Sequence, residues 1–232
     1  MDRRTLLDRM WYQVAKYMVR ALVAIMFRAR FSGERNVPRR GGVLVVSNHQ
    51  SHLDPPLIGV GFPRQMVFLA RRTLYRFRPF GWLIGSLGAI PIDREGFALS
   101  GIRATINWLR QEEAVLVFPE GTRSRDGNLG VFKPGLTLVA RRARVPILPA
   151  AIEGGYDAWP RADRFPRPGP VHVHYGAPIS PEEIAACGDR ELADLVETRV
   201  RECFELLRQR REFARHRGNT ALGAGLPTSP NR

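Results

Sequence analysis

Residues 43–54 read VLVVSNHQSHLD, an apolar run followed by a polar segment that contains a histidine and an aspartate. The four consecutive aliphatic residues at 43–46 predict a short buried strand. The polar residues after them predict a loop that leaves this strand, which is a common setting for catalytic groups. In that loop, His49 and Asp54 offer a base and a carboxylate that could orient it.

The spacing of His49 and Asp54 restricts how the two side chains can meet. On a continuous helix, five residues turn the chain by about 500°, so the side chains would point roughly 140° apart. They meet only if the backbone turns between them. Pro55 and Pro56 follow the aspartate. Because proline disfavours helical geometry in the residue before it and suits the first helical position, Asp54 is predicted to be the N-cap of a helix that begins at Pro55. The alternative is an ordinary helix cap beside a surface histidine.

The net charge of the 232-residue chain is +14, and its sequence pI is about 11.2. The length suits a single domain with a sizeable core. So large a positive charge predicts an anionic partner, which can be a nucleic acid, a membrane surface or a phosphorylated substrate. Residues 1–40 carry a net charge of +7, whereas residues 182–232 are neutral. The excess charge therefore belongs to the N-terminal segment and the core.

The only cysteines are Cys187 and Cys203, both in the C-terminal region. Two such cysteines predict free thiols and a reducing compartment. The Cys and His residues have no zinc spacing, so no metal site is predicted. A secretory signal peptide is not expected, and no stretch approaches the ~20 apolar residues that are needed to span a bilayer.

Residues 8–30 are predicted to form one helix with a broad apolar face. Its apolar residues follow the spacing of such a face at Trp11, Val14, Ala15, Met18, Leu22 and Ile25. Polar residues form a narrow stripe at Gln13, Lys16, Arg20 and Arg28. A broad apolar arc edged by Lys and Arg is typical of a helix that lies in the membrane interface. The alternative is that this face packs on the core of the protein.

The rest of the chain alternates short apolar runs with helical stretches. Strands are predicted at residues 43–47, 66–70, 89–92, 114–118, 145–152 and 171–175. Helices are predicted from Pro55 to about Gly61 and at residues 98–112, 135–143 and 181–217, the last capped by Ser180. This alternation predicts an α/β fold, a single domain with helices on the faces of a central sheet. The expected units are an N-terminal interfacial helix (1–32), a core (33–180), a C-terminal helix (181–217) and a disordered tail (218–232).

Two further motifs carry an arginine after a predicted strand, and a third carries a lone lysine before a proline turn. They read GAIPIDR at residues 88–94, FPEGTRS at 118–124 and FKPG at 132–135. Arginine suits phosphate because its planar fork can bond two oxygens at once. Taken singly, each of these basic residues is most simply explained as a solvated side chain at the end of a strand.

Together with NHQSHLD (48–54) and VPILP (145–149), these motifs occur in the order and spacing of the glycerolipid acyltransferases. Over about residues 35–180 the chain resembles the 1-acylglycerol-3-phosphate acyltransferase family, and the HX4D block at 48–54 and the block at 118–124 are the most specific parts. The resemblance implies a mixed central sheet in a glycerol-3-phosphate acyltransferase-like α/β fold. The N-terminal segment departs from family members that carry transmembrane helices, since a single interfacial helix must anchor this chain.

The resemblance also implies an activity in phospholipid biosynthesis. An acyl group would move from acyl-CoA or acyl carrier protein to the hydroxyl of a lysophosphatidic acid-type acceptor, giving phosphatidic acid, with no metal or other cofactor. By motif match, His49 would be the base and Asp54 its partner. The acceptor would be held by Arg94, Glu120, Gly121, Thr122, Arg123 and Lys133. Glycerol-3-phosphate or another lyso-lipid is the alternative acceptor.

Direct attack of the acceptor alcohol on the thioester is favoured over an acyl-enzyme. The chain has no Gly-x-Ser-x-Gly motif, and both cysteines lie far from the histidine in sequence. Ser51 is predicted to form hydrogen bonds within the loop. His52 is a competing base, but only His49 has the matching aspartate.

A different class of function is a non-catalytic protein that binds nucleic acid or anionic lipid. The net charge and the Arg- and aromatic-rich residues 71–82 would suit it. Against specific nucleic-acid binding, the arginines are interleaved with Gly- and Pro-rich turns, and no recognised nucleic-acid motif is present. The expected location is the cytoplasmic face of the cell membrane, with peripheral or monotopic attachment to the anionic surface.

Overall fold

A mixed sheet of seven strands forms the centre of the computed structural model, which describes residues 6–76, 78–86, 88–92, 97–133 and 135–223. The strands are β1 (Arg30–Ser32), β2 (Val43–Ser47), β3 (Met66–Arg71), β4 (Ala89–Ile92), β5 (Ala114–Val117), β6 (Ile147–Glu153) and β7 (His172–Tyr175). They lie in the order β1-β7-β6-β2-β5-β3-β4. Because β6 and β7 pair antiparallel while the other pairs are parallel, the sheet is mixed, as the sequence predicted.

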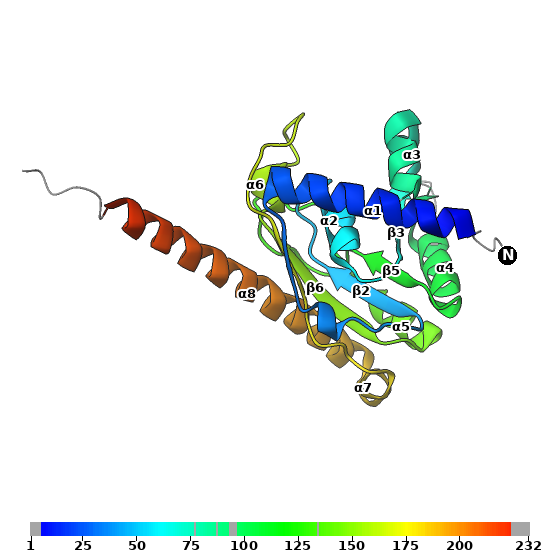
Figure 1. The fold of residues 1–232 in the computed structure, drawn as a ribbon. Coiled ribbons are helices and arrows are strands. Elements are labelled where there is room, and N and C mark those ends of the chain that lie inside the picture. The colour runs from blue at the N-terminus through cyan, green and yellow to red at the C-terminus, as the bar shows by residue number, and fades with distance from the viewer. Residues whose placement is uncertain (1–5, 77, 87, 93–96, 134, 224–232) are drawn as a thin grey trace, which may run out of the picture.

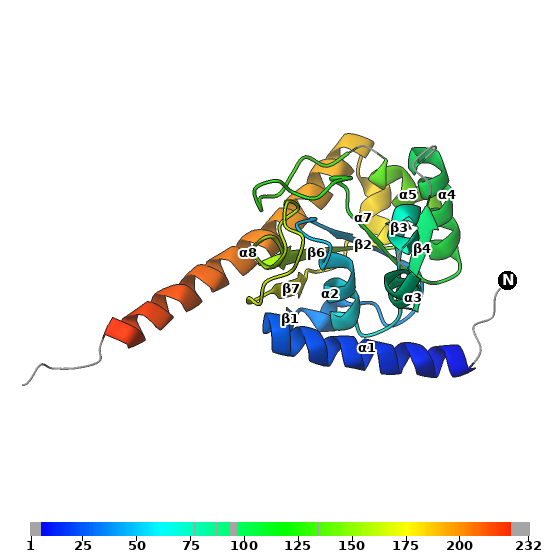
Figure 2. The ribbon, with the colours of Figure 1, turned by 90° about the horizontal axis from the view of Figure 1, so that it is seen from above.

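Helices cover both faces of this sheet (Figures 1 and 2). On one face lie α1 (Leu6–Phe27), α2 (Asp54–Gly61) and α3 (Arg78–Ser86), and on the other lie α4 (Phe97–Arg110), α5 (Leu136–Ala143), α7 (Pro181–Ala186) and α8 (Asp189–Gly223). A short α6 (Gly155–Ala158) and the 3-10 helices η1 (Glu34–Asn36) and η2 (Arg72–Arg76) connect elements. The six predicted strands are confirmed to within two residues at each end, whereas β1 and α3 were not predicted.

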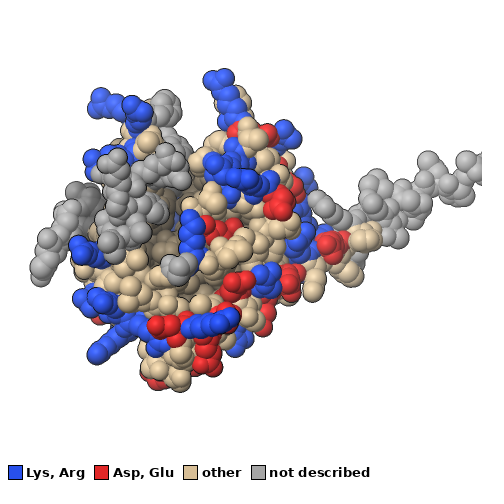
Figure 3. All heavy atoms as spheres, turned by 180° about the vertical axis from the view of Figure 1, so that it is seen from behind, with Lys and Arg blue, Asp and Glu red and all other residues tan. Residues whose placement is uncertain are grey.

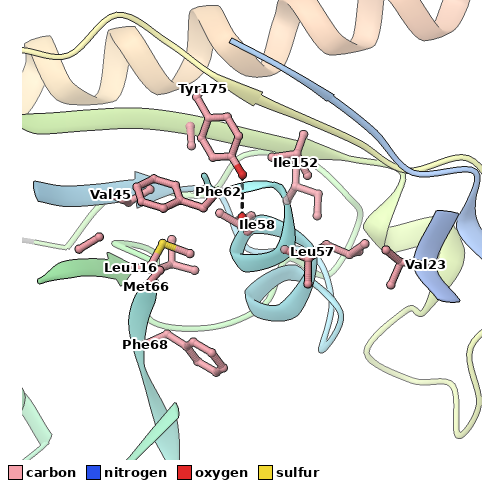
Figure 4. Close-up of a cluster of buried hydrophobic side chains, with 14 of the residues drawn as sticks. Val23, Val45, Leu57, Ile58, Phe62, Met66, Phe68, Leu116, Ile152 and Tyr175 are labelled. Atoms are coloured by element: carbon pink, nitrogen blue, oxygen red, sulfur yellow. Dashed lines mark hydrogen bonds between the residues drawn. The ribbon is translucent and has the colours of Figure 1, made fainter. Parts of the chain in front are cut away.

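The two faces of the sheet bury separate clusters of apolar side chains. Alternate residues of β2 point to opposite sides, so Val43 and Val45 pack towards α1 and α2 while Leu44 and Val46 pack towards α4, α5 and α8. Figure 4 shows the first cluster, in which Tyr175 reaches from β7 to α2 and its hydroxyl donates a hydrogen bond of 2.6 Å to the Ile58 carbonyl. This bond satisfies a phenol that is otherwise fully buried.

The C-terminal region differs from the single helix that was predicted over residues 181–217. The chain leaves the helical conformation at Cys187 and Gly188, which separate α7 from α8. Ser180 does cap α7, through a capping box with Glu183, so that part of the prediction is confirmed. Residues 218–223, predicted to be disordered, continue α8, and residues 224–232 lie outside the described residues. The C-terminal turns of α8, beyond Arg211, project away from the body of the protein (Figure 1).

Helix α1 packs on the core through a side that shares only Ala15 with the six residues of the predicted apolar face. Its buried residues are Tyr12, Ala15, Lys16, Val23 and Phe27. The ammonium of Lys16 donates to the carbonyl oxygen of Phe62, and the Arg20 guanidinium donates to that of Val60 at 3.4 Å. Both carbonyls lie at the C-terminal end of α2, where helix backbone oxygens need donors. The two basic side chains therefore fasten α1 to α2 and do not edge an outward face as predicted.

The apolar residues of α1 consequently face outwards. Exposed on it are Met10, Trp11, Val14, Tyr17, Met18, Leu22 and Ile25. Trp11 also contacts Trp82 of α3, with ring centroids 5.4 Å apart, and the Trp82 side chain is itself exposed. The alternative that the predicted apolar face as a whole packs on the core is therefore wrong. Among the described residues, no helix combines the length and the apolar character that crossing a bilayer requires.

Candidate active site

The candidate site lies where β2, β5 and β6 end. These strands are neighbours and run parallel, so their carboxyl ends meet at one edge of the sheet. The loop after β2 carries His49, the loop after β5 carries residues 118–124, and the segment after β6 runs through α6 to Trp159. Ligands of open α/β sheets bind at such carboxyl ends. Sheet register thus brings together motifs that are about seventy residues apart in sequence.

A hydrogen bond of 2.8 Å joins His49 Nδ1 to Asp54 Oδ2. The same oxygen accepts the backbone N–H groups of Gln50 and Ser51, at 2.5 and 2.7 Å. An oxygen with three such contacts serves as a hydrogen-bond acceptor in each of them. The proton of the bond to His49 must therefore be carried by Nδ1. Nε2 of the neutral ring is left as the acceptor, and His49 lines the large cleft described below. This His49–Asp54 dyad confirms that the backbone turns between the two residues.

The predicted N-cap role of Asp54 is wrong. The residue is the first of α2, Leu53 precedes it as the cap, and Pro55 is the second helical residue. The fully buried carboxylate turns back to the loop of residues 49–51 instead of capping the N–H groups ahead of it. The carboxylate still lies at the N-terminal end of α2, the positive end of the helix dipole.

Residues of the loop after β5 hold His49 in place. The backbone N–H of His49 donates to Glu120 Oε1 at 2.8 Å, and the Ser124 N–H donates to the His49 carbonyl at 2.7 Å. The imidazole stacks on the Phe118 ring with centroids 4.0 Å apart. The second oxygen of Glu120 accepts the Gly130 N–H at 3.1 Å. Glu120 was predicted to hold the acceptor, but both of its oxygens are engaged with backbone, and burial raises the pKa of its carboxyl group.

Asn48 fixes the start of the same loop, a role that the sequence did not reveal. Its side-chain amide donates to the Ile152 carbonyl and accepts the Ile152 N–H, each at 2.9 Å. The buried amide therefore continues the pairing of β2 and β6 beyond the end of the backbone ladder. The conspicuous polarity of Asn48 at the end of an apolar run was the only signal that could have indicated it.

Gly121 and Lys133 lie against each other at the rim of the site. Gly121 has a positive φ of 66°, which allows the turn, and a Cβ placed there would lie 2.7 Å from Lys133 Nζ. The Lys133 backbone N–H donates to the Pro119 carbonyl at 2.9 Å, so the motifs at 118–124 and 132–135, which the family resemblance assigns to one acceptor site, lie together. The hydroxyl of Thr122 accepts a bond of 3.3 Å from Arg161, a residue that sequence patterns did not single out.

A cleft of about 1380 Å³ opens beside the dyad. Its walls are apolar and come from α1, α2, β3, α4, β5 and α5. The described basic residues that line it are Arg72, Arg76, Arg123, Lys133 and Arg161, and no Asp or Glu is among the described lining residues. Arg94, predicted to hold phosphate, lies outside the described residues. The cleft thus combines an apolar interior with a positively charged rim next to His49.

Other candidates for the chemistry fit less well. Ser51 donates to the Trp159 carbonyl and accepts the Leu53 N–H, which confirms its predicted role within the loop. The ring of His52 packs edge-on against Trp159, and it is His49, not His52, that reaches Asp54. Both cysteines are free, and burial raises the pKa of Cys203 to about 11, which disfavours a thiolate nucleophile. Over the described part of the chain, no three His, Cys, Asp or Glu side chains gather to hold a metal ion.

Basic side chains are spread over the face of the protein that Figure 3 shows. On the face that Figure 3 shows, Lys and Arg are scattered among acidic and uncharged residues and do not form one continuous stripe. A groove that follows a nucleic-acid backbone needs a continuous positive surface. The visible distribution does not favour the alternative of nucleic-acid binding.

The fold, the dyad at the carboxyl edge of the sheet and the cleft beside it together define an enzyme of the acyltransferase class. A family model described as Acyltransferase matches residues 28–153. The chain belongs to the 1-acylglycerol-3-phosphate acyltransferase family.

Similar proteins cover most of the chain. The 1-acyl-sn-glycerol-3-phosphate acyltransferase of Pseudomonas aeruginosa is 32% identical over 80% of this chain and 70% of its own. That of Streptococcus pneumoniae is 29% identical over 86% of this chain and 74% of its own. The crystal structure of the 1-acyl-sn-glycerophosphate (LPA) acyltransferase PlsC from Thermotoga maritima superposes with a TM-score of 0.74 at 28% identity, covering 89% of this chain and 84% of that one.

Proposed function

We propose that the protein transfers a fatty acyl group from a thioester carrier, acyl-CoA or acyl carrier protein, to the free hydroxyl of a lysophosphatidic acid-type acceptor, giving phosphatidic acid. The observation that carries this proposal is the 2.8 Å bond between His49 and Asp54 at the edge of a cleft with apolar walls and a basic rim. The names of the relatives favour the same acceptor.

In the proposed mechanism, His49 acts as general base while Asp54 holds the imidazole in one tautomer. Nε2 takes the proton of the acceptor hydroxyl as the oxygen forms a bond to the thioester carbonyl carbon. The tetrahedral oxyanion then collapses, the carbon–sulfur bond breaks, and His49 returns the proton to the leaving thiolate. The products are an ester and a free thiol, and no acyl-enzyme forms.

The acceptor phosphate would bind at the rim of the cleft. Arg123 and Lys133 line this rim, and a dianionic phosphate requires such donors in place of the water that it loses. Arg94 is a further candidate from the sequence motif. Glu120 has a supporting role in this proposal, because its carboxylate accepts the backbone N–H of His49 and does not bind the substrate.

The apolar surface of α1 would place the cleft at a membrane. Val19, Leu22 and Met26 of α1 line the cleft, and the exposed apolar residues of the helix lie next to them in sequence. A large exposed apolar surface on a soluble domain marks a site of interaction with a membrane or a partner. We propose peripheral attachment at the cytoplasmic face of the cell membrane, with α1 lying in the plane of the interface. Acyl chains could then enter the cleft from the bilayer.

Glycerol-3-phosphate and other lyso-lipids are the competing acceptors. The apolar walls favour a lipid over glycerol-3-phosphate, because the small polar acceptor would leave them in contact with water. The rim favours a phosphomonoester over a zwitterionic head group.

The test supplies labelled acyl-CoA or labelled acyl carrier protein with lysophosphatidic acid, glycerol-3-phosphate or lysophosphatidylcholine. We expect the highest kcat/KM with lysophosphatidic acid. Transfer to glycerol-3-phosphate at an equal or higher rate would contradict the lipid assignment. Failure of transfer to every acceptor from both carriers would contradict the activity itself.

A further inference from the structure

Gln50 lies within the dyad loop, but its side chain points away from the cleft. The residue is buried, and its amide belongs to the other side of the loop, among residues of the β6–α6 segment. Its Nε2 donates to the Gly127 carbonyl at 2.7 Å and to Glu153 Oε2 at 3.2 Å, and its Oε1 accepts the Tyr156 N–H at 3.3 Å. Its own backbone N–H donates to Asp54 Oδ2. One residue therefore connects the catalytic carboxylate to a separate polar network.

That network reaches the C-terminal helix. Arg211 of α8 donates through Nη1 to Glu153 Oε1 at 2.8 Å and through Nη2 to Asp157 Oδ2. The Arg211 side chain is only 13% exposed and that of Glu153 only 11%. Removing one partner of such a shielded ion pair leaves the other charge without compensation, so the contact resists being broken. The two carboxylates belong to the end of β6 and to α6, which Arg211 thereby holds together.

The same segment lies directly behind Asp54. Gly155 allows this close approach, since a Cβ placed on it would lie 2.7 Å from Asp54 Oδ1. Ser51 donates to the carbonyl of Trp159, one residue beyond α6. Residues 153–159 thus support the loop at Gln50, at Ser51 and at Asp54. A shift of this segment would move the dyad with it.

We propose that Gln50 is a positioning residue, which joins the His49–Asp54 dyad to the Glu153–Arg211 ion pair so that helix α8 holds the catalytic geometry from behind. The proposal rests on the proposed function only for its kinetic consequence. Its structural content, that the hydrogen bond between His49 and Asp54 depends on Gln50 and Arg211, can be measured without turnover.

Two variants of the full-length protein test the link, each with acyl-CoA and lysophosphatidic acid in vesicles. Gln50→Leu keeps roughly the volume of the side chain and removes its three hydrogen bonds. Arg211→Gln removes the ion pair that anchors Glu153. We expect kcat to fall by up to about 10²-fold, as for misplacement of a catalytic group, while both Michaelis constants stay unchanged.

A matched control addresses mere loss of stability. Arg141 of α5 fastens the opposite end of α8, through Asp189 at 2.9 Å and the Cys187 carbonyl, far from the dyad loop in the fold. Because Asp189 is 83% exposed, whereas the Arg211 and Glu153 side chains are shielded, we expect Arg141→Gln to lower the melting temperature less than Arg211→Gln does and to keep the wild-type kcat.

A double variant tests the specific contact. Gln50→Glu alone places two carboxylates against each other. Adding Glu153→Gln restores one donor and one acceptor between the two positions and the original net charge, although it replaces the Arg211–Glu153 ion pair by a hydrogen bond to a neutral amide oxygen. We expect the double variant to recover part of the kcat that Gln50→Glu loses.

The readout that does not need activity is the low-field proton resonance of the bond between His49 Nδ1 and Asp54, assigned by its loss in His49→Ala. We expect it in the wild type and in Arg141→Gln, and expect it to be lost or shifted in Gln50→Leu and Arg211→Gln. A folded Gln50→Leu protein with wild-type kcat and an unchanged resonance would overturn the inference. So would equal losses of kcat in Arg211→Gln and Arg141→Gln, since α8 would then contribute only general stability.

Discussion

The dyad loop and helix α1 differ in which kinds of side chain they bury and which they expose. In the loop of residues 48–54, polar side chains are buried and nearly every donor and acceptor has a partner within the protein. On α1, the charged side chain of Lys16 is buried, while seven large apolar side chains are exposed. The loop is built to hold one geometry, and α1 to present a surface to something outside the chain.

The difference teaches how far a local pattern determines structure. The geometry of the loop follows from contacts within a few residues and from the register of β2, β5 and β6, so the motif alone was informative. The orientation of α1 depends on which hydrogen-bond acceptors the core presents to the helix. Because the C-terminal end of α2 presents free carbonyls, Lys16 and Arg20 gain more by capping them than by facing solvent.

The largest expected effect concerns the loop. His49→Ala should lower kcat by about 10²–10⁴-fold, the usual contribution of a general base, with an unchanged melting temperature. His52→Ala removes a second imidazole from the same cleft and should cost much less. Steady-state kinetics with lysophosphatidic acid provides the measurement. A folded His49→Ala protein with near-normal turnover would remove the basis for the dyad.

The next effect concerns α1. Met18 and Ile25 are 66% and 80% exposed, and replacing both by serine should weaken vesicle binding by about 10²-fold, at roughly 1.5 kcal/mol for each apolar side chain. The control replaces Phe213 and Val131, which are similarly exposed elsewhere on the protein, and should leave binding unchanged. Co-sedimentation with anionic vesicles is the measurement. Equal losses of binding in both pairs of variants would show that α1 is not a specific membrane surface.

Point variants are preferable to deleting residues 1–30, because the deletion would also remove the buried Val23 and Phe27.

A smaller effect distinguishes the acceptor side of the cleft from the donor side. Arg123→Lys should raise the KM for lysophosphatidic acid by about tenfold, because an ammonium cannot reproduce the bidentate fork and one charged hydrogen bond is worth ~1.5 kcal/mol. The KM for acyl-CoA should not change. Arg125→Lys, two residues along the same loop, is the matched control because Arg125 does not line the cleft. A rise confined to the acyl-CoA KM would reassign Arg123 to the donor.

The smallest effect is a pH dependence of stability at β7, the strand next to β6. Burial lowers the pKa of His172 and His174, and Arg30 and Arg210 respectively lower it further. The unfolded chain therefore takes up these protons at about pH 6.5, before the folded protein does, so stability should decline as the pH falls below that value.

Melting temperatures between about pH 7.5 and 5.5 test this pH dependence. A variant with both histidines replaced by glutamine should lose less stability over this interval than the wild type. An identical decline in the two proteins would assign the acid sensitivity to other groups.

The sequence was most informative where a function depends on neighbouring residues. The strand at 43–47 and the contact of His49 with Asp54 were predicted, and the family resemblance placed Gly121 and Lys133 in one site, where they do lie against each other. The role of Glu120 in holding the backbone of His49 was not predicted. The direction in which a buried carboxylate points depends on backbone donors from loops that are distant in sequence.

Other features were missed for similar physical reasons. Strand β1 spans three residues, too few for a periodic pattern, and pairs with a strand about 140 residues away. Arg161 and Arg211 reach the site and its supporting network through tertiary packing alone. The break between α7 and α8 lies at Gly188, a residue type that can end a helix, inside a stretch whose helical spacing continues on both sides.

The most direct test of the dyad is a double-mutant cycle on kcat with His49→Ala, Asp54→Asn and both together. Asp54→Asn keeps the shape of the carboxylate but presents a donor to Nδ1, which selects the wrong tautomer and should lower kcat by up to about 10⁴-fold. If the two residues act as one unit, the double variant is no slower than the slower single variant, because the second substitution removes nothing that is still in use. If instead the two losses multiply, His49 and Asp54 contribute independently, and the central claim that the carboxylate works only through the imidazole is contradicted.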